Sequence, residues 1–306
     1  MHIEVGRQRK PSVKSGSLIN QQTLVPAWVD DLPTSRFRRV SATFHGTRGM
    51  DVLTFQQRVV HAYRTAFEQL DATQFTYPVR FWAFIPGIHD DLGAGLDRYM
   101  SFNAGRYGAF AQHYGHPSSF GGPIPTASAV GIQGDQFVLH CLASDEPGRA
   151  VENPRQVSAY HYSRRFGPMP PCFARATLLQ GDSHQPLLLV GGTASITGEE
   201  SRHAGNIEAQ AGETFRNLAS VVAAATGYHV PENASRANVH DFLAAFRHLR
   251  VYYSTSADQA TLLQLVKANF SNDCRVEWLQ ASLCRPELQV EIEGVAVPPG
   301  DCSGAD

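Results

Sequence analysis

The alternation of apolar and polar positions divides the chain into two stretches that share one order of elements. In the first stretch, apolar residues at helical spacing begin near Asp51 and predict an amphipathic helix that ends near Leu70. The turn signal Gly134-Asp135 separates two further predicted strands. The elements expected after the first helix are a strand at 79–85, a helix at about 96–113, and strands at 127–132 and 136–142.

The second stretch repeats this order. A long helix is expected at about 207–226, ended by Gly227, and a strand follows at 249–253. Ser256 and Gln259 have the spacing of a capping box, which predicts a helix from Ser256 to about Phe270. The remaining expected strands are 275–283 and 288–297, with earlier ones at 157–162, 173–179 and 187–190.

The repeated order predicts an α+β fold built from two units, each a mixed sheet with helices packed on one face. The charged segment 145–153, which contains Gly and Pro, suggests a boundary between units 1–150 and 151–306. The first forty residues show no clear periodicity, and we expect them to run over the surface.

Composition narrows the class of protein. The 306 residues carry a formal net charge of -2, which argues against a general nucleic-acid binder. The five cysteines are widely spaced and lack a C-x-x-C pair, so neither a disulfide framework nor a zinc site is indicated and a reduced, cytoplasmic chain is expected. No apolar run has the length of a membrane span or of a signal-peptide core, and the histidines lack metal-ligand spacing.

Several polar residues stand in otherwise apolar surroundings and could bind a small anion. Arg175 interrupts an apolar run, Arg164 lies among aromatic residues, and Arg106 and Tyr107 lie together in a predicted helix. Gly191-Gly192 ends a strand where backbone N–H groups could approach a ligand. Each also has a structural explanation, since paired arginines often form a solvated turn and paired glycines a bend. Common hydrolase, nucleotide and dinucleotide motifs do not occur.

Four segments taken together resemble the chorismatase family. They are LDRYMSFNAGRYGAF, VENPRQVSAYHYSRRFGPMPPCFARA, LLLVGGTASITGEESRH and LCRPELQVEIEGVAV, in the order of the family's blocks and spanning about residues 78–297. The resemblance implies two units of the YjgF-like (chorismate-mutase-like) fold in one monomeric chain without a cofactor or metal. It also implies that chorismate is held mainly by the C-terminal unit.

The resemblance implies that Glu291, matching the glutamate of the family's final strand, is the acid that protonates the enol ether of chorismate. A carboxyl group can protonate an enol ether near neutral pH if burial raises its pKa. Glu293, on the same face of the strand, could raise the pKa of Glu291 further. The two carboxylates of chorismate call for guanidinium partners, which we assign to Arg164, with Arg106 and Arg175 as further candidates. Tyr107, Tyr160 and Tyr162 are expected to pack on the ring, with backbone donors at Gly192, Thr193 and Ala194.

Two questions stay open at the level of sequence. Water attack after protonation gives a dihydroxycyclohexadienoate, whereas attack by the ring hydroxyl gives a hydroxybenzoate. Cys284 matches the position at which hydroxybenzoate-forming members carry cysteine, which favours 3-hydroxybenzoate and leaves 4-hydroxybenzoate open. An imine deaminase of the same fold is a competing interpretation, although the deaminases' substrate arginine would fall near Asp273. The second competing interpretation is a small-molecule binding protein that has this pocket but does not convert its ligand.

Overall fold

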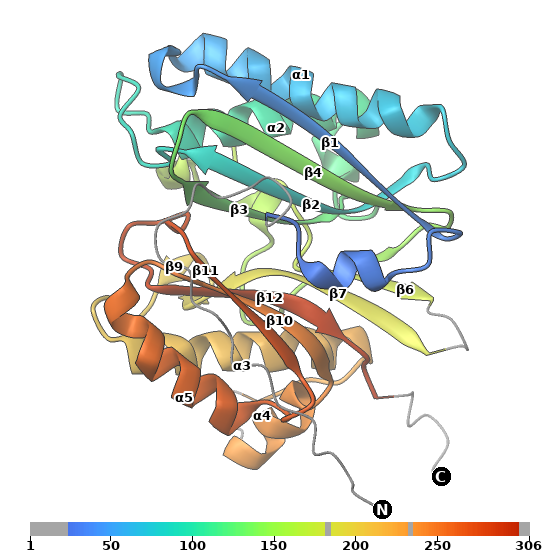
Figure 1. The fold of residues 1–306 in the computed structure, drawn as a ribbon, viewed down its shortest axis with the longest axis vertical. Helices are drawn as coiled ribbons and strands as arrows, with labels where there is room; N and C mark the ends of the chain where they lie inside the picture. Colours follow the sequence, from blue (N-terminus) through green and yellow to red (C-terminus); the bar gives the residue numbers. More distant parts are fainter. Residues whose placement is uncertain (1–23, 181–184, 232–234, 300–306) are drawn as a thin grey trace, which may run out of the picture.

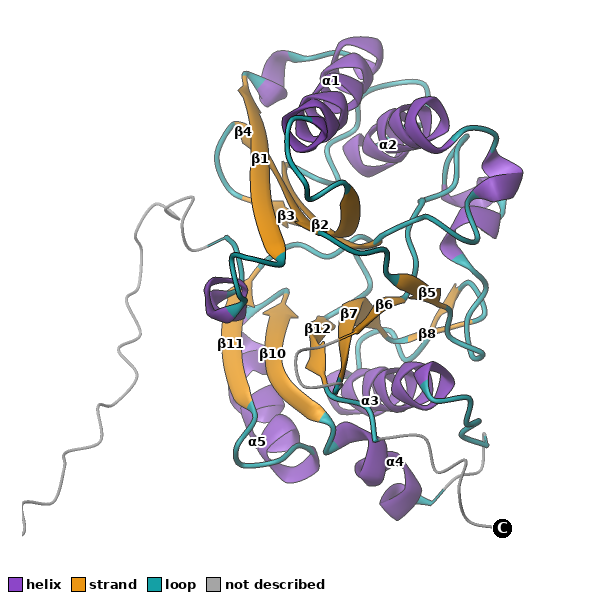
Figure 2. Ribbon diagram, turned by 90° about the vertical axis from the view of Figure 1, so that its right-hand side faces the viewer, coloured by secondary structure: helices purple, strands orange, loops and turns teal. Residues whose placement is uncertain are grey.

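A computed structural model describes residues 24–180, 185–231 and 235–299 as four layers: helices, sheet, sheet, helices (Figure 1). The two sheets face each other across an apolar core, and the helices cover their outer faces (Figure 2). The chain therefore has the predicted α+β class, with helices on one face of each sheet.

The N-terminal sheet is mixed and has four strands in the order β1-β4-β2-β3. Only β2 and β3 are parallel. Helices α1 and α2 begin where Asp51 and Asp97 accept hydrogen bonds from the backbone N–H groups of Thr54 and Met100. The elements are β1 (Phe37–His45), α1 (Val52–Asp71), β2 (Tyr77–Pro86), α2 (Arg98–Tyr114), β3 (Thr126–Ile132) and β4 (Gln136–Ser144).

The C-terminal sheet has six strands in the order β11-β10-β12-β7-β6-β5, with β10 and β11 parallel. Its strands are β5 (Arg149–Val151), β6 (Ala176–Gln180), β7 (Pro186–Ala194), β10 (Phe246–Tyr253), β11 (Arg275–Gln280) and β12 (Val290–Ala296). Its helices are α3 (Ile207–Ala225), α4 (Arg236–Leu243) and α5 (Gln259–Asn269). A separate short hairpin is formed by β8 (Ile196–Thr197) and β9 (Glu200–Ser201).

The expected internal repeat is present in the connections. The series β7-α3-β10-α5-β11-β12 has the same order and strand directions as β1-α1-β2-α2-β3-β4. The unit therefore begins with a strand, β1, that the periodicity did not reveal in the first half. Its burial alternates between buried and exposed residues over much of its length.

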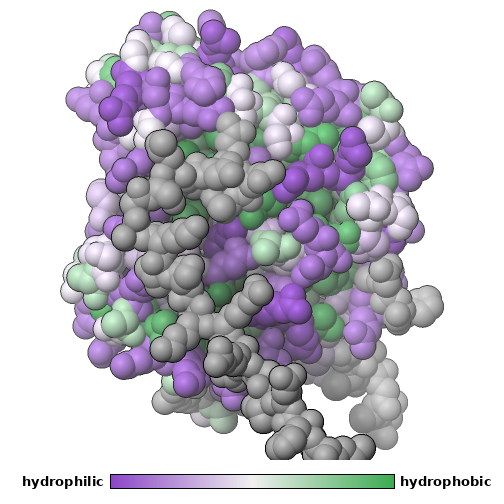
Figure 3. Space-filling view, in the orientation of Figure 1, coloured by the Kyte–Doolittle hydropathy of each residue, from purple (hydrophilic) through white to green (hydrophobic). Residues whose placement is uncertain are grey.

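Three apolar cores hold the layers together. One lies between the N-terminal sheet and α1 and α2, and a second lies between the C-terminal sheet and α3, α4 and α5. The third fills the space between the sheets. Hydrophilic side chains predominate on the face shown in Figure 3, as expected when apolar side chains are directed into these cores.

The expectation for the first forty residues is wrong where the structure describes them. Leu24, Val25, Trp28 and Val29 are buried in the core between the sheets, because a short 3-10 helix at Ala27–Asp31 brings its apolar residues against that core. Residues 1–23 lie outside the described part of the chain.

Two local predictions also need correction. The segment 157–162 is not a strand; Ala159–His161 forms a 3-10 helix, and hydrogen bonds run from His161 to Ser158 and from Tyr162 to Ala159. Ser256 does not cap the helix, because Thr255 caps a 3-10 turn at Ser256–Asp258 and α5 begins at Gln259. The chain leaves β11 after Gln280, earlier than predicted, so residues 281–289 form a loop before β12.

Candidate active site

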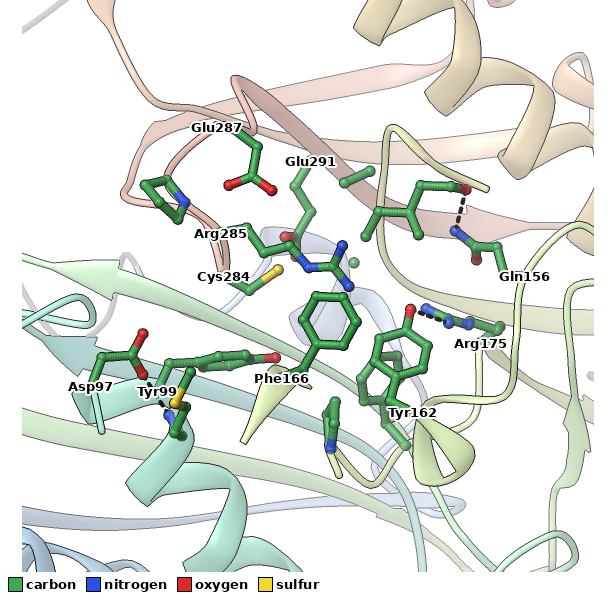
Figure 4. A pocket seen from close by; sticks show the side chains of 17 residues that line it. Asp97, Tyr99, Gln156, Tyr162, Phe166, Arg175, Cys284, Arg285, Glu287 and Glu291 are labelled. Atoms are coloured by element: carbon green, nitrogen blue, oxygen red, sulfur yellow. Dashed lines mark hydrogen bonds between the residues drawn. The ribbon is translucent and has the colours of Figure 1, made fainter. Parts of the chain in front are cut away.

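A cavity of about 230 Å³ opens between the two sheets, close to the start of β12. This volume suits a small organic molecule and is too small for a polymer. The cavity is lined by the start of α2, the segment 156–175, strands β7, β8 and β12, and the loop 284–287 (Figure 4). The N-terminal unit contributes Asp97, Tyr99 and Met100, so the cavity belongs to both halves of the chain.

Glu291 is the buried carboxyl group of this cavity. It lies on β12, is 4% exposed, and pairs in register with Tyr252 of β10 and Ala194 of β7. Burial first and the neighbouring Glu293 second raise the pKa of Glu291 to about 8, against the lowering effect of Arg80 and Arg175. At neutral pH the side chain is therefore mainly a carboxylic acid, able to donate a proton.

The close approach of Glu291 to β7 requires a glycine at position 192. A Cβ atom there would lie 1.9 Å from Glu291 Oε1 and 3.0 Å from Ser128 Oγ. The Gly192 N–H donates to Ser128 Oγ at 2.8 Å. This glycine thus serves to make room for the acid.

Arg175 supplies one cationic group to the cavity. Its Nη2 donates to the Val157 carbonyl at 2.7 Å and to the Tyr162 hydroxyl at 2.8 Å (Figure 4). Its Nε is buried and has no hydrogen-bond partner in the described part of the chain. Among the described residues Arg175 forms no ion pair, which leaves its charge available to a ligand anion.

Arg285 supplies the second cationic group. Its Nη1 donates to the Glu199 carbonyl and to Ser201 Oγ, both at 2.9 Å, which ties the loop before β12 to the β8–β9 hairpin. Its guanidinium lies 4.0 Å from the centroid of the Phe166 ring, as Figure 4 illustrates. No carboxylate of the described chain forms an ion pair with Arg285. The cavity therefore has two guanidinium groups that no acidic side chain neutralises directly.

The rest of the wall is mainly apolar or neutral. Tyr99, Met100, Phe166 and Phe173 provide aromatic and thioether surface. Burial and the nearby Glu291 raise the pKa of Cys284 to about 12, so the side chain is a thiol at neutral pH. A thiol of this kind is a poor nucleophile.

Other kinds of site find no support in the described residues. No group of three or more His, Cys, Asp and Glu side chains is placed to hold a metal ion there. Within the same residues, none of the helices has both the length and the apolar character that a membrane crossing requires.

Comparison with known proteins gives the family. Residues 38–143 match the family model "Chorismatase FkbO/Hyg5-like, N-terminal". A 3-hydroxybenzoate synthase of Streptomyces hygroscopicus is 35% identical over 240 residues, which cover 77% of this chain and 68% of that protein. The chain belongs to the chorismatase family. A chorismatase of Streptomyces rapamycinicus is 30% identical over 76% of this chain and 68% of its own length.

A solved structure supports the same assignment. The crystal structure of a chorismatase, 26% identical, superposes with a TM-score of 0.74 over 86% of this chain and 75% of that one. Since the chain belongs to the chorismatase family, the competing interpretation as an imine deaminase is not favoured.

Only part of the predicted set of site residues lines the cavity of this chorismatase. Glu291, Cys284, Arg175, Tyr162, Gly192 and Ala194 do. Thr193 is buried but does not line the cavity, and its hydroxyl donates to the Gly191 carbonyl at 2.9 Å. Tyr160 is half-buried against the ring of His161.

Arg164, expected to be the main partner of the substrate carboxylates, does not line this cavity. Arg164 begins a 3-10 helix, Arg164–Phe166, that turns Phe166 toward the cavity and leaves Arg164 exposed. Arg106 and Tyr107 also lie outside the cavity, because α2 directs them into the N-terminal unit. Arg106 donates to Asn103 Oδ1 at 2.9 Å and lies over Phe102 and Phe173, while Tyr107 packs on Phe120.

Sequence reasoning missed Arg285 and the contribution of α2. Arg285 lies one residue after Cys284, inside a segment that carries the family resemblance and between the strands expected at 275–283 and 288–297. Its position next to a cavity residue was the available signal. Tyr99 lies on the first turn of α2, and only the packing of the two sheets brings that turn to the cavity.

Proposed function

We propose that this protein converts chorismate into pyruvate and 3-hydroxybenzoate, with Glu291 as the proton donor. The observation that carries the proposal is a buried carboxylic acid that shares one cavity with two guanidinium groups, neither of which forms an ion pair with a carboxylate of the described residues. Chorismate is a dianion with an acid-labile enol ether, so it needs both features. The relative named 3-hydroxybenzoate synthase supports the choice of product.

Binding in this proposal depends on Arg175 and Arg285. Each guanidinium has donors left for a carboxylate, and both lie in a partly apolar cavity where charge-assisted hydrogen bonds are strong. Hydrogen bonds to Tyr162, Ser201 and backbone carbonyls fix both groups before the substrate arrives. Fixed donors lose little entropy on binding, which favours a planar dianion.

The chemical step in this proposal begins when Glu291 donates its proton to the methylene carbon of the enolpyruvyl group. The resulting oxocarbenium centre weakens the bond between the ether oxygen and the ring. The ring hydroxyl then attacks the neighbouring ring carbon that carries the ether; the bond from that carbon to the pyruvate oxygen breaks, the hydroxyl proton is released and an epoxide forms. The epoxide oxygen then separates from the carbon that originally carried the hydroxyl, the proton on the attacked ring carbon is lost, and protonation of the oxygen gives 3-hydroxybenzoate. Chorismate thereby divides into two products without consuming water, and the proton given by Glu291 is balanced by the one that the ring releases.

The route through water is the alternative outcome for the same intermediate, and Cys284 bears on the choice. Its neutral thiol lies in the cavity wall near Glu291, and in this proposal it keeps an attacking water away from the cation. Excluding water from the cation favours attack by the ring hydroxyl.

The product assay tests this assignment. We expect incubation with chorismate to give pyruvate and 3-hydroxybenzoate in equal amounts, as measured by chromatography. Cys284→Ala opens space beside Glu291, so the share of dihydroxycyclohexadienoate should rise. Exclusive formation of the dihydrodiol acid by the unaltered protein would contradict the product assignment, and absence of pyruvate would contradict the function.

Gly192→Ala is expected to lower kcat by about 100-fold, because the new Cβ displaces the Glu291 carboxyl by a distance on the order of 1 Å. The matched control is Gly212→Ala in α3, where an added Cβ meets no atom within 4 Å. The control should keep full turnover and gain slight stability from its helical position. Steady-state kinetics measure turnover and thermal unfolding measures stability for both variants. An unchanged kcat in Gly192→Ala would show that turnover does not depend on the position of the Glu291 carboxyl.

Three further assignments complete the proposal. The protein acts as a monomer in the cytoplasm, and the chain divides into units near residue 150. The four cysteines of the described residues are free, as a reducing compartment would leave them, and Cys302 lies outside those residues. Size-exclusion chromatography with light scattering tests the monomer directly.

A further inference from the structure

A second buried glutamate lies behind the proposed proton donor. Glu293 is 1% exposed and, because side chains alternate along a strand, it lies on the same face of β12 as Glu291. That face is directed at the N-terminal sheet. Glu293 is absent from the cavity wall, so it does not contact a ligand bound there.

The partners of Glu293 come from the other sheet. Arg80 Nη2 donates to one carboxylate oxygen at 2.6 Å, and Trp82 Nε1 donates to the other at 2.9 Å. Arg80 and Trp82 are two residues apart on β2 and therefore on one face of that strand. Ser128 of β3 donates a third hydrogen bond to Glu293. Three donors stabilise the anion and hold it in one position.

Ser128 connects this anion to the place where Glu291 lies. Its Oγ donates to Glu293 and accepts from the backbone N–H of Gly192 at 2.8 Å. Gly192 is the residue against which the Glu291 carboxyl packs. A continuous path of contacts therefore runs from β2 and β3 of the first sheet through Glu293 to β7 and Glu291 of the second.

We propose that Glu293 is a positioning residue for the reaction: the N-terminal sheet fixes Glu293, and Glu293 in turn sets the protonation state and position of Glu291. This inference rests on the proposed function of Glu291. It also gives the N-terminal unit a part in catalysis beyond the cavity wall, through Arg80, Trp82 and Ser128.

The charges around Glu291 determine the sign of the effect. Glu293 raises the pKa of Glu291, second only to burial, while Arg80 and Arg175 lower it. Other titratable groups near Glu291 or in its cavity come from β10, the start of α2, the segment 156–175 and the loop before β12: Tyr252, Asp97, Tyr99, Tyr162, Cys284, Arg285 and Glu287. Removing the Glu293 charge should therefore lower the pKa of Glu291 and convert the acid into a carboxylate at lower pH.

Glu293→Gln is the test, because it removes the charge and keeps the size. We expect the alkaline limb of kcat/KM to move down by about one to two pH units. At a pH above that limb, kcat/KM then falls about 10- to 100-fold, whereas at lower pH it approaches the wild-type value. A purely structural role would lower kcat/KM equally at every pH, and that result would overturn the proposal.

Two further variants keep the test decisive. Glu293→Gln leaves the charge of Arg80 without its carboxylate partner. The double variant Arg80→Met with Glu293→Gln removes both charges, so the alkaline limb of its kcat/KM profile should move down by less than in Glu293→Gln alone. Glu277→Gln is the matched control: Glu277 is ion-paired with Arg250 through Nη2 at 2.6 Å on the same sheet but lies outside the cavity. In Glu277→Gln the alkaline limb of kcat/KM should lie at the same pH as in the wild type.

A spectroscopic reading separates this proposal from the function on which it rests. The infrared band of the protonated Glu291 carboxyl, identified by its loss in Glu291→Gln, can be titrated without any substrate. We expect its midpoint to fall in Glu293→Gln and to stay constant in Glu277→Gln. A constant midpoint in Glu293→Gln would overturn the role of Glu293, whereas failure of the wild type to convert chorismate would overturn only the proposed function.

Discussion

Glu291→Gln is expected to reduce kcat on chorismate by about 100- to 10,000-fold, the range typical for loss of a general acid. Glutamine keeps the shape of the side chain but has no proton of comparable acidity to donate. Chorismate should still bind with nearly unchanged affinity, because the proposed binding groups Arg175 and Arg285 are intact. Calorimetric titration for binding and a pyruvate assay for turnover measure the two effects separately.

The same variant carries its own control for folding. The raised pKa of Glu291, about 8 against 4.5 for an unperturbed Glu, means that the folded state holds a proton the unfolded state releases. The contribution of Glu291 to stability is thus complete below about pH 4.5 and is lost as the pH rises through about 8. Glu291→Gln should therefore unfold at an equal or higher temperature than the wild type at pH 8. Retained turnover in a folded variant would rule out Glu291 as the acid.

Arg285→Met and Arg175→Met are each expected to raise KM for chorismate by about 30- to 1,000-fold, which corresponds to about 2–4 kcal/mol for a lost charge-assisted contact. Methionine keeps much of the apolar stem that packs against Phe166 and Phe173. Substrate titrations of the initial rate give KM and kcat separately.

Arg164→Met is the matched control for these two variants. Arg164 is a neighbouring arginine that the structure places outside the cavity with its side chain exposed. Its KM should stay within about twofold of the wild-type value, as expected for an exposed substitution. A large rise for Arg164→Met with small changes for the other two would reverse the assignment of the anion-binding groups.

The fold was predictable where the pattern was long and periodic. Helices α1 and α3 were found close to their observed bounds, because their apolar faces extend over several turns. Strand β1 was missed because the adjacent Arg38 and Arg39 interrupt its alternation of buried and exposed positions, which is regular only from Val40 to His45. The burial of Leu24 and Trp28 could not be foreseen, since the core between the sheets that receives them forms only in three dimensions.

The site was predictable only along β12 and its flanks. Glu291 and Cys284 lie in one short segment that resembles the family. Among the arginines, the sequence ranked Arg164 above Arg175 because aromatic neighbours suggested a pocket wall, and it passed over Arg285. The direction of a side chain in a loop depends on local turns such as Arg164–Phe166, which a sequence pattern does not specify. Long-range pairs such as Arg80 with Glu293, 213 positions apart, leave no local signal at all.

The pH dependence of kcat/KM, measured for the wild type beside Glu291→Gln, tests most directly whether Glu291 acts as the acid. Chorismate stays a dianion over the relevant range, so the profile reports the free enzyme. We predict a plateau that ends near pH 8 and then a tenfold fall per pH unit, with no such limb in the residual activity of Glu291→Gln. A wild-type rate that rises between pH 6 and 9 would mean that the reactive form is a carboxylate or another base, and would contradict the account.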